Sequence, residues 1–171
     1  MKKIFFIFTL MTLSVLAFAQ KAGEKITFSG SDLNGNPVKS EIFAENKVTM
    51  LNIWGTFCGP CIREMPDLAK LNEENKDKNF EVVGIIIDIL DQKGKVDSGI
   101  KANAELIIKK TGTDYIHIIP SDEMNNGWLK DIQAVPTTIF VDSNGKQIGK
   151  PYVGSRSQKD WQKIIDKILN K

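Results

Sequence analysis

The chain has 171 residues, 42% of them hydrophobic and 26% charged, which suits one packed globular domain and argues against disorder. Its 23 basic and 21 acidic side chains nearly balance, and Lys2 and Lys3 precede the apolar N-terminal run. Without those two lysines the count is 21 against 21, so charge gives no reason to expect binding to nucleic acid or to an anionic membrane.

Residues 1–19 have the pattern of a secretory signal peptide. The basic start "MKK" precedes the apolar run "IFFIFTLMTLSVLAF", and small side chains at Ala17 and Ala19 favour cleavage after Ala19. The alternative is an uncleaved anchor, but a spanning helix needs about 20 apolar residues, and the run 4–19 supplies 16. We expect an exported protein, in the periplasm or at the extracytoplasmic face of the membrane, with one domain over residues 20–171.

The first part of this domain alternates strand and helix patterns. Asn34-Gly35 predicts a β-hairpin between strands at 25–28 and 38–40. The β-rich run "KVTMLNIW" predicts a buried strand that ends just before the cysteines. Apolar residues at helical spacing then predict a helix containing Pro66, and "FEVVGIIIDIL" predicts a second buried strand.

The second part continues the alternation. Asp97 and Gly112 are typical start and stop signals of a helix. "DYIHII" predicts a short strand and "NNGWLKDI" a short helix, while "VPTTIFVDSNGKQIGKPYVG" predicts two strands joined by a turn. Ser157 caps a last amphipathic helix. The order predicts an α/β fold with a central mixed β-sheet between helices and antiparallel strands at one side.

The only two cysteines, Cys58 and Cys61, lie two residues apart in "NIWGTFCGPCIREMP". A zinc site needs four ligands, and the chain adds a single histidine, His117, although a site shared between chains or a copper(I) site stays open. As a stabilising staple the pair gains little, because so short a loop removes only about 2 kcal/mol of unfolded-state entropy.

A redox couple explains the surroundings of the pair. Cys58 falls where a strand meets a helix, and the helix N-terminus favours its thiolate, so Cys58 is expected to be the nucleophile. Cys61, one turn further on, is placed to resolve the mixed disulfide. Pro60 suits the first helical turn, where its missing N–H costs nothing.

With "AVPTTIFVDSNGK" downstream, this motif resembles the TlpA/ResA branch of the thioredoxin-fold proteins, which are extracytoplasmic thiol-disulfide oxidoreductases. The resemblance covers about Gly23 to the C-terminus. It implies a thioredoxin fold with an N-terminal β-hairpin and a central insertion at 91–112. It also implies a redox-active Cys58–Cys61 disulfide with no further cofactor and no metal.

The resemblance implies roles for other residues. Pro136 matches the family's cis-proline beside the cysteine pair, and the backbone of Val135 is expected to bind the client chain. Phe57 stands where the family usually has Trp, which implies a change in client preference. Trp54 is expected to pack under the site, or simply to fill the core. The full substrate-binding surface is expected to comprise Trp54, Phe57, Gly59, Pro60 and Val135.

One acidic residue is expected to serve the exchange reaction. Asn52 occupies the position of the buried aspartate of cytoplasmic thioredoxins, and the branch instead places an acid after the following strand. Asp91 is the nearest match, with Asp88 second. A buried carboxylate near Cys61 could take its proton, which makes Asp91 a catalytic candidate. The alternative is an ordinary loop aspartate, and His117 is expected to be structural.

The Gly-Pro dipeptide between the cysteines is that of thioredoxin, a low-potential reductant, and favours a reductase of protein disulfides. Such an exported reductase needs a membrane electron donor resembling DsbD or CcdA, and its clients could include apocytochromes c; we expect a monomer. The alternatives are a disulfide oxidase or isomerase, an exported metal-binding chaperone and a thiol peroxidase. Peroxiredoxins carry Thr three residues before the reactive Cys, whereas Thr56 is two before Cys58.

Overall fold

The computed structural model describes residue 23 and residues 25–170. The expected signal peptide, residues 1–19, lies outside the described residues. Within the described part of the chain, no helix has both the length and the apolar character that crossing a membrane requires.

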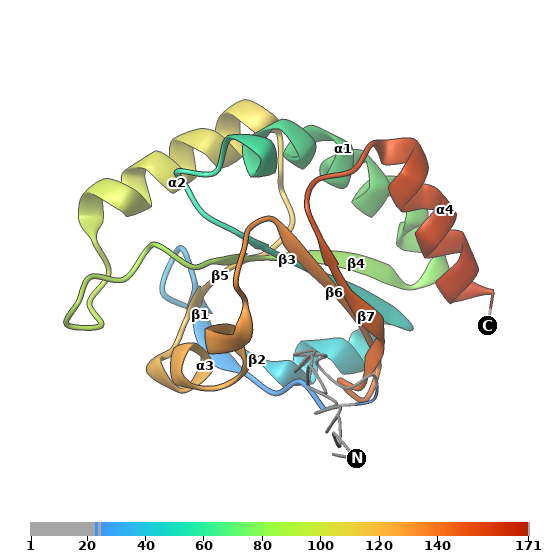
Figure 1. The fold of residues 1–171 in the computed structure, drawn as a ribbon, viewed down its shortest axis with the longest axis horizontal. Helices are drawn as coiled ribbons and strands as arrows, with labels where there is room; N and C mark the ends of the chain where they lie inside the picture. Colours follow the sequence, from blue (N-terminus) through green and yellow to red (C-terminus); the bar gives the residue numbers. More distant parts are fainter. Residues whose placement is uncertain (1–22, 24, 171) are drawn as a thin grey trace, which may run out of the picture.

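A seven-stranded mixed sheet forms the centre of the fold, in the order β2-β1-β5-β4-β3-β6-β7 (Figure 1). The pairs β3–β4 and β4–β5 are parallel, and the other pairs are antiparallel. The strands are β1 (Ser29–Asp32), β2 (Pro37–Lys39), β3 (Val48–Trp54), β4 (Phe80–Ile86), β5 (His117–Pro120), β6 (Thr137–Asp142) and β7 (Gln147–Val153).

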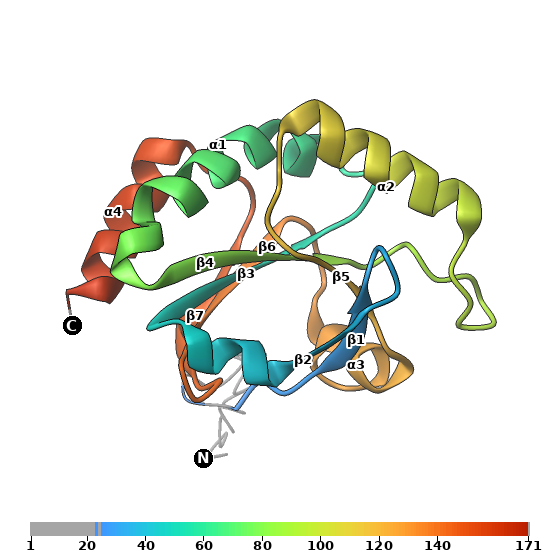
Figure 2. The same cartoon turned by 180° about the vertical axis from the view of Figure 1, so that it is seen from behind.

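Helices cover both faces of this sheet, as Figures 1 and 2 show. One face carries the longer helices α1 (Gly59–Asn75), α2 (Ser98–Thr111) and α4 (Gln158–Leu169). The other face carries α3 (Asp122–Asn126) and the 3-10 helices η1 (Ser40–Glu45) and η3 (Trp128–Asp131), while η2 (Lys76–Lys78) extends α1. The predicted α/β fold, a mixed sheet between helices, is confirmed.

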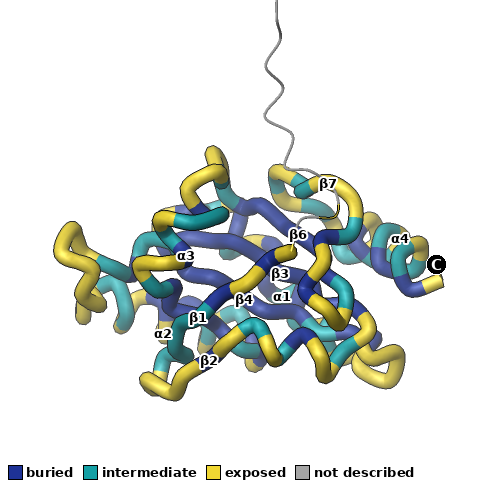
Figure 3. The backbone as a smooth tube through the Cα atoms, turned by 90° about the horizontal axis from the view of Figure 1, so that it is seen from below, coloured by how far each residue is buried: buried dark blue, intermediate teal, exposed yellow. Residues whose placement is uncertain are grey.

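The central strands are buried on both faces, which explains their continuous apolar sequences. Along β3, Leu51 and Ile53 join the core beneath η1 and α3, whereas Met50 and Trp54 point to the side of α1. All seven residues of β3 are buried, and the middle of the sheet is the most buried part of the tube in Figure 3. The predicted strands at β3 and β4 are confirmed.

Local signals at helix ends are also confirmed. The carboxylate of Asp97 accepts hydrogen bonds from the backbone N of Gly99 and Ile100 at the start of α2. Gly112 ends that helix in the left-handed conformation, with φ of 68°. The Oγ of Ser157 accepts from a backbone N in the first turn of α4.

The N-terminal hairpin is confirmed, but its first strand lies later than expected, at Ser29–Asp32 instead of 25–28. The carboxylate of Asp32 accepts hydrogen bonds from the backbone N of Asn34 and Asn36, so the turn closes directly after Asp32. The preceding residues leave the ladder because their side chains enter the core: the Phe28 ring packs edge-on against Phe43 of η1.

The predicted insertion, 91–112, contains α2, and the strand that follows it lies inside the sheet. After α2, β5 runs parallel to β4 on one side and antiparallel to β1 on the other. Among the described residues, the hairpin therefore joins the rest of the sheet through β5. The predicted short helix at 125–132 is divided between α3 and η3, with Gly127 between them.

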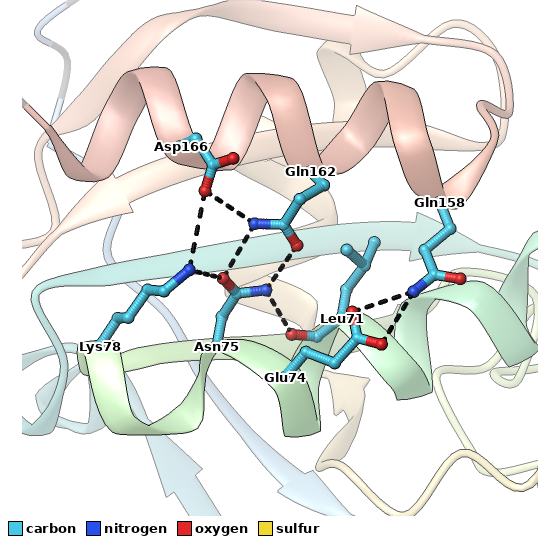
Figure 4. A network of polar contacts seen from close by, with 7 residues as sticks. All are labelled: Leu71, Glu74, Asn75, Lys78, Gln158, Gln162 and Asp166. Carbon is cyan, nitrogen blue, oxygen red and sulfur yellow. Dashed lines mark hydrogen bonds and ion pairs between the residues drawn. The ribbon is translucent and has the colours of Figure 1, made fainter.

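A polar network joins α4 to α1 (Figure 4). The fully buried side chain of Asn75 donates to Leu71 O and to Gln162 Oε1, and its own oxygen accepts from Gln162 Nε2 and Lys78 Nζ. Gln162 also donates to Asp166. Every hydrogen-bonding position of the buried amide group is therefore used where the two helices meet.

Replacing Asn75 with alanine should lower the free energy of unfolding by about 1–3 kcal/mol, because it leaves the Oε1 of the partly buried Gln162 without its donor and removes one acceptor of Gln162 Nε2. Urea denaturation followed by circular dichroism measures the change. The control is Gln158→Ala, which removes a hydrogen bond to the exposed Glu74 and should cost at most about 0.5 kcal/mol. If both variants lost the same free energy of unfolding, the buried Asn75 network would contribute no more to stability than the exposed hydrogen bond of Gln158.

Candidate functional site

Cys58 and Cys61 form a disulfide at the first turn of α1. Cys58 is the N-cap of this helix, and its Sγ accepts a hydrogen bond from Cys61 N at 3.2 Å. Pro60 lies in the first turn, as expected. Cys58 is 5% exposed and Cys61 0%, so a reagent from solvent meets Cys58 first.

The turn before Cys58 presents an aromatic ring to solvent. Phe57 is 69% exposed, next to the disulfide. Its ring lies over the backbone of Gly55, where a Cβ would come within 2.6 Å of Phe57 Cε1. Glycine at position 55 therefore lets the ring fold back over the chain. Gly59 is half-buried and Pro60 exposed on the other side of Cys58.

Trp54 lies beneath the site and is fully buried. It belongs to the same core cluster as both cysteines, and its Nε1 donates to Nδ1 of His117 at 3.2 Å. A Cβ at Gly84, on the strand between them, would overlap the His117 ring, so the indole–imidazole bond depends on glycine there. Burial lowers the pKa of His117 to about 3, so the ring is neutral and acts as an acceptor.

The Val135–Pro136 peptide bond is cis, as the resemblance implied. Val135 packs against the core cluster that contains both cysteines. The loop is tied down on both sides of the proline. Thr137 Oγ1 donates to Ala134 O at 2.7 Å, and Gly154 N donates to Pro136 O at 2.8 Å.

Glu64 is a buried carboxylate on α1 that the sequence analysis did not identify. It lies one turn after Cys61 on the buried side of the helix, and it is 3% exposed. Burial raises its pKa, while hydrogen bonds from Arg156 N, Asn52 Nδ2 and Trp161 Nε1 oppose that rise. The sequence signal that could have identified Glu64 is its position three residues after Cys61, which places both side chains on the same side of a helix.

The structure does not place Asp91 as the expected buried acid. Asp91 is exposed, and its carboxylate accepts hydrogen bonds from the backbone N of Lys93 and Lys95, which closes its own loop. The expectation of a buried carboxylate at Asp91 is therefore wrong. Asp88, the second candidate, is half-buried and binds Thr56, both through the backbone N and through the hydroxyl.

Among the residues that the structure describes, no group of three or more His, Cys, Asp or Glu side chains is arranged to hold a metal ion. The one histidine is engaged with Trp54 in the core. The described residues bring together the two sulfurs and, one turn further along α1, the buried carboxylate of Glu64.

Comparison with known proteins agrees with this geometry. The model of the Redoxin family matches residues 20–168. The thiol-disulfide oxidoreductase ResA of Oceanobacillus iheyensis is 32% identical over 60% of this chain and 47% of its own length. The thiol:disulfide interchange protein DsbE of Pasteurella multocida is 28% identical over 99% of this chain and 96% of its own.

Solved structures confirm the fold. The crystal structure of a thiol:disulfide interchange protein of the thioredoxin family from Chlorobium tepidum superposes with a TM-score of 0.70 at 24% identity. The match covers 87% of this chain and 97% of that one. The predicted thioredoxin fold and the resemblance to the TlpA/ResA branch are therefore confirmed.

Glu64→Gln should change the pH dependence of stability. Because burial raises the pKa of Glu64 above 4.5, the native state holds this proton more tightly than the unfolded chain does. The resulting stabilisation is complete below the unfolded pKa and is lost as pH rises through the native one. From about pH 4 to about pH 8, the unfolding free energy of the oxidised wild type should fall relative to that of Glu64→Gln.

Urea denaturation at a series of pH values measures this difference. Glu73→Gln is the matched control, because Glu73 is an exposed glutamate on the same helix, and its stability curve should run parallel to that of the wild type. If the curve of Glu64→Gln also ran parallel, the raised pKa of Glu64 would be refuted.

Proposed function

The chain belongs to the Redoxin family and is a thiol-disulfide oxidoreductase, and we propose that it acts outside the cytoplasm as a reductase of protein disulfides. The observation that carries the proposal is the disulfide at the N-terminus of α1, in which Cys58 is 5% exposed and Cys61 is fully buried. The Gly59-Pro60 dipeptide between the cysteines supports the reducing direction.

In the reduced protein, Cys58 is the nucleophile. The backbone N of Cys61 points at its sulfur, and the N-terminal end of a 17-residue helix stabilises negative charge there. The Cys58 thiolate attacks one sulfur of the client disulfide. A mixed disulfide forms, and the other client sulfur leaves as a thiolate.

Cys61 completes the exchange. Its sulfur gives up a proton, attacks the Cys58 sulfur and restores the Cys58–Cys61 disulfide, while the second client sulfur leaves as a thiolate. The client gains two electrons and the protein loses two. Complete burial keeps Cys61 away from external disulfides and leaves Cys58 as its partner.

Glu64 takes the role that the sequence analysis assigned to Asp91. It lies on the same side of α1 as Cys61, one turn away, and burial makes its carboxylate a stronger base than an exposed one. We assign it as the acceptor of the Cys61 proton. Asn52 supports this role by donating to Glu64 Oε1 from β3.

The client meets the protein at an apolar surface around Cys58. The exposed ring of Phe57 lies on one side, and Val135 of the cis-proline loop packs against the core cluster that contains both cysteines. An extended client segment would pair with that backbone, while Phe57 would contact the side chains next to the client disulfide.

The N-terminal pattern supports export, which keeps the protein away from cytoplasmic thiols. The dithiol must then be regenerated by a donor that carries electrons across the membrane, of the DsbD or CcdA type. The protein is proposed to act as a monomer and to bind no nucleic acid.

Both single cysteine variants should lose catalytic reduction of insulin, for different reasons. Cys58→Ser lacks the nucleophile, whereas Cys61→Ser attacks and then stays joined to insulin through Cys58. Turbidity measures turnover, and non-reducing electrophoresis detects the mixed disulfide only with Cys61→Ser. A wild type without turnover but with stoichiometric bound metal would instead indicate a metal carrier.

The reduction potential should lie well below that of an oxidase. Equilibration with glutathione buffers, followed by thiol alkylation and mass spectrometry, should give a value between about −200 and −300 mV, the range of the reducing members of this chemistry. A value above about −150 mV would favour a disulfide oxidase or isomerase.

A further inference from the structure

Asp88 makes a second connection to the site that the mechanism above does not use. It lies just beyond the end of β4, and its carboxylate accepts hydrogen bonds from Thr56 N at 3.1 and 3.0 Å and from Thr56 Oγ1 at 2.6 Å. Thr56 is two residues before Cys58 and is 9% exposed. The carboxylate therefore engages both donors of the residue that leads into the nucleophile.

These bonds hold the turn that places Cys58. The backbone N of Ile87 donates to Trp54 O at 3.0 Å, and the backbone N of Cys58 donates to Gly55 O at 3.0 Å. Together with the bonds of Asp88, they fix the path from the end of β3 to the start of α1. A carboxylate acceptor makes such bonds stronger than a neutral one does.

The hydrogen bonds to Thr56 also hold the Asp88 carboxylate beside the turn that leads to Cys58. In the part of the chain that the structure describes, none of the ion pairs includes Asp88. On α1, the Arg63 guanidinium lies beside Gly59, and the buried Glu64 lies one turn after Cys61, while His117 on β5 is neutral. The Asp88 carboxylate thus adds a negative charge on the β4 side of Cys58.

We propose that Asp88 is a positioning residue that holds Cys58 at the helix start through Thr56 and whose charge disfavours the Cys58 thiolate. This inference rests on the proposed disulfide chemistry but concerns the reduction potential of the Cys58–Cys61 disulfide. The helix N-terminus stabilises the thiolate, and Asp88 opposes that effect. A less stable Cys58 thiolate makes the reduced protein less stable relative to the disulfide form. Asp88 therefore lowers the reduction potential of the Cys58–Cys61 disulfide.

Asp88→Asn tests the charge while preserving the size of the side chain. The pH midpoint of iodoacetamide alkylation at Cys58 should shift to lower pH. The equilibrium constant for reduction of the disulfide by two glutathione molecules, which gives the dithiol and oxidised glutathione, should rise on the order of three- to tenfold. Asp88→Ser, a second neutral variant, should shift both readouts in the same direction.

Two further variants separate charge from a general loss of structure. Asp88→Glu restores the charge and should return both readouts toward the wild type. Asp77→Asn makes the same charge change at an exposed position near the far end of α1 and should leave both unchanged. Asp88→Asn values equal to those of Asp77→Asn, or equal shifts in Asp88→Asn and Asp88→Glu, would overturn the proposal.

Both readouts use small thiol reagents and the isolated protein. They therefore stand whether or not the protein reduces disulfides in proteins, which the insulin assay tests separately. If the wild type reduces insulin but Asp88→Asn leaves the alkylation midpoint and the glutathione equilibrium constant unchanged, this inference alone is refuted. A wild type that fails with insulin but shows the Asp88→Asn shift would refute only the proposed function.

Discussion

The chemistry of the protein depends on the junction at which β3 ends and α1 begins. β3 lies between β4 and β6, all of its residues are buried, and its direction is fixed by hydrogen bonds on both sides. The chain therefore leaves the sheet at one defined place, and Cys58 becomes the N-cap of a long helix there. The same junction buries Cys61 and exposes Phe57, and Val135 of the cis-proline loop packs against the core cluster that holds both cysteines.

The features that local sequence determines were predictable. Cap residues, the Asn-Gly turns and the buried strands follow from the preferences of single residues and from periodicity, and Asp97, Gly112 and Ser157 act as predicted. The cysteine pair was predictable for the same reason, because a strand pattern before it and a helix pattern after it place it at a helix start. The cis bond at Pro136 came from the family resemblance and not from the residues themselves.

The acid at the site was not predictable in this way. Glu64 lies on a helix rich in charged residues, where a glutamate is usually exposed, and its burial results from partners 92 and 97 residues away, Arg156 and Trp161. Asp91 had the expected place in the chain, but its carboxylate is used by its own loop. The place of β5 between β4 and β1 likewise results from long-range pairing, which periodicity does not report.

The surroundings of Glu64 also have a consequence for the order of assembly. Two of its three hydrogen-bond donors, Arg156 N and Trp161 Nε1, belong to the last sixteen residues of the chain, and the third, Asn52, belongs to β3. The cysteines can meet as soon as the first turn of α1 forms, because they are neighbours in sequence. The acid beside them gains its full environment only when Arg156 and α4 are in place, so the setting of Glu64 depends on contacts between distant parts of the chain, whereas the disulfide does not.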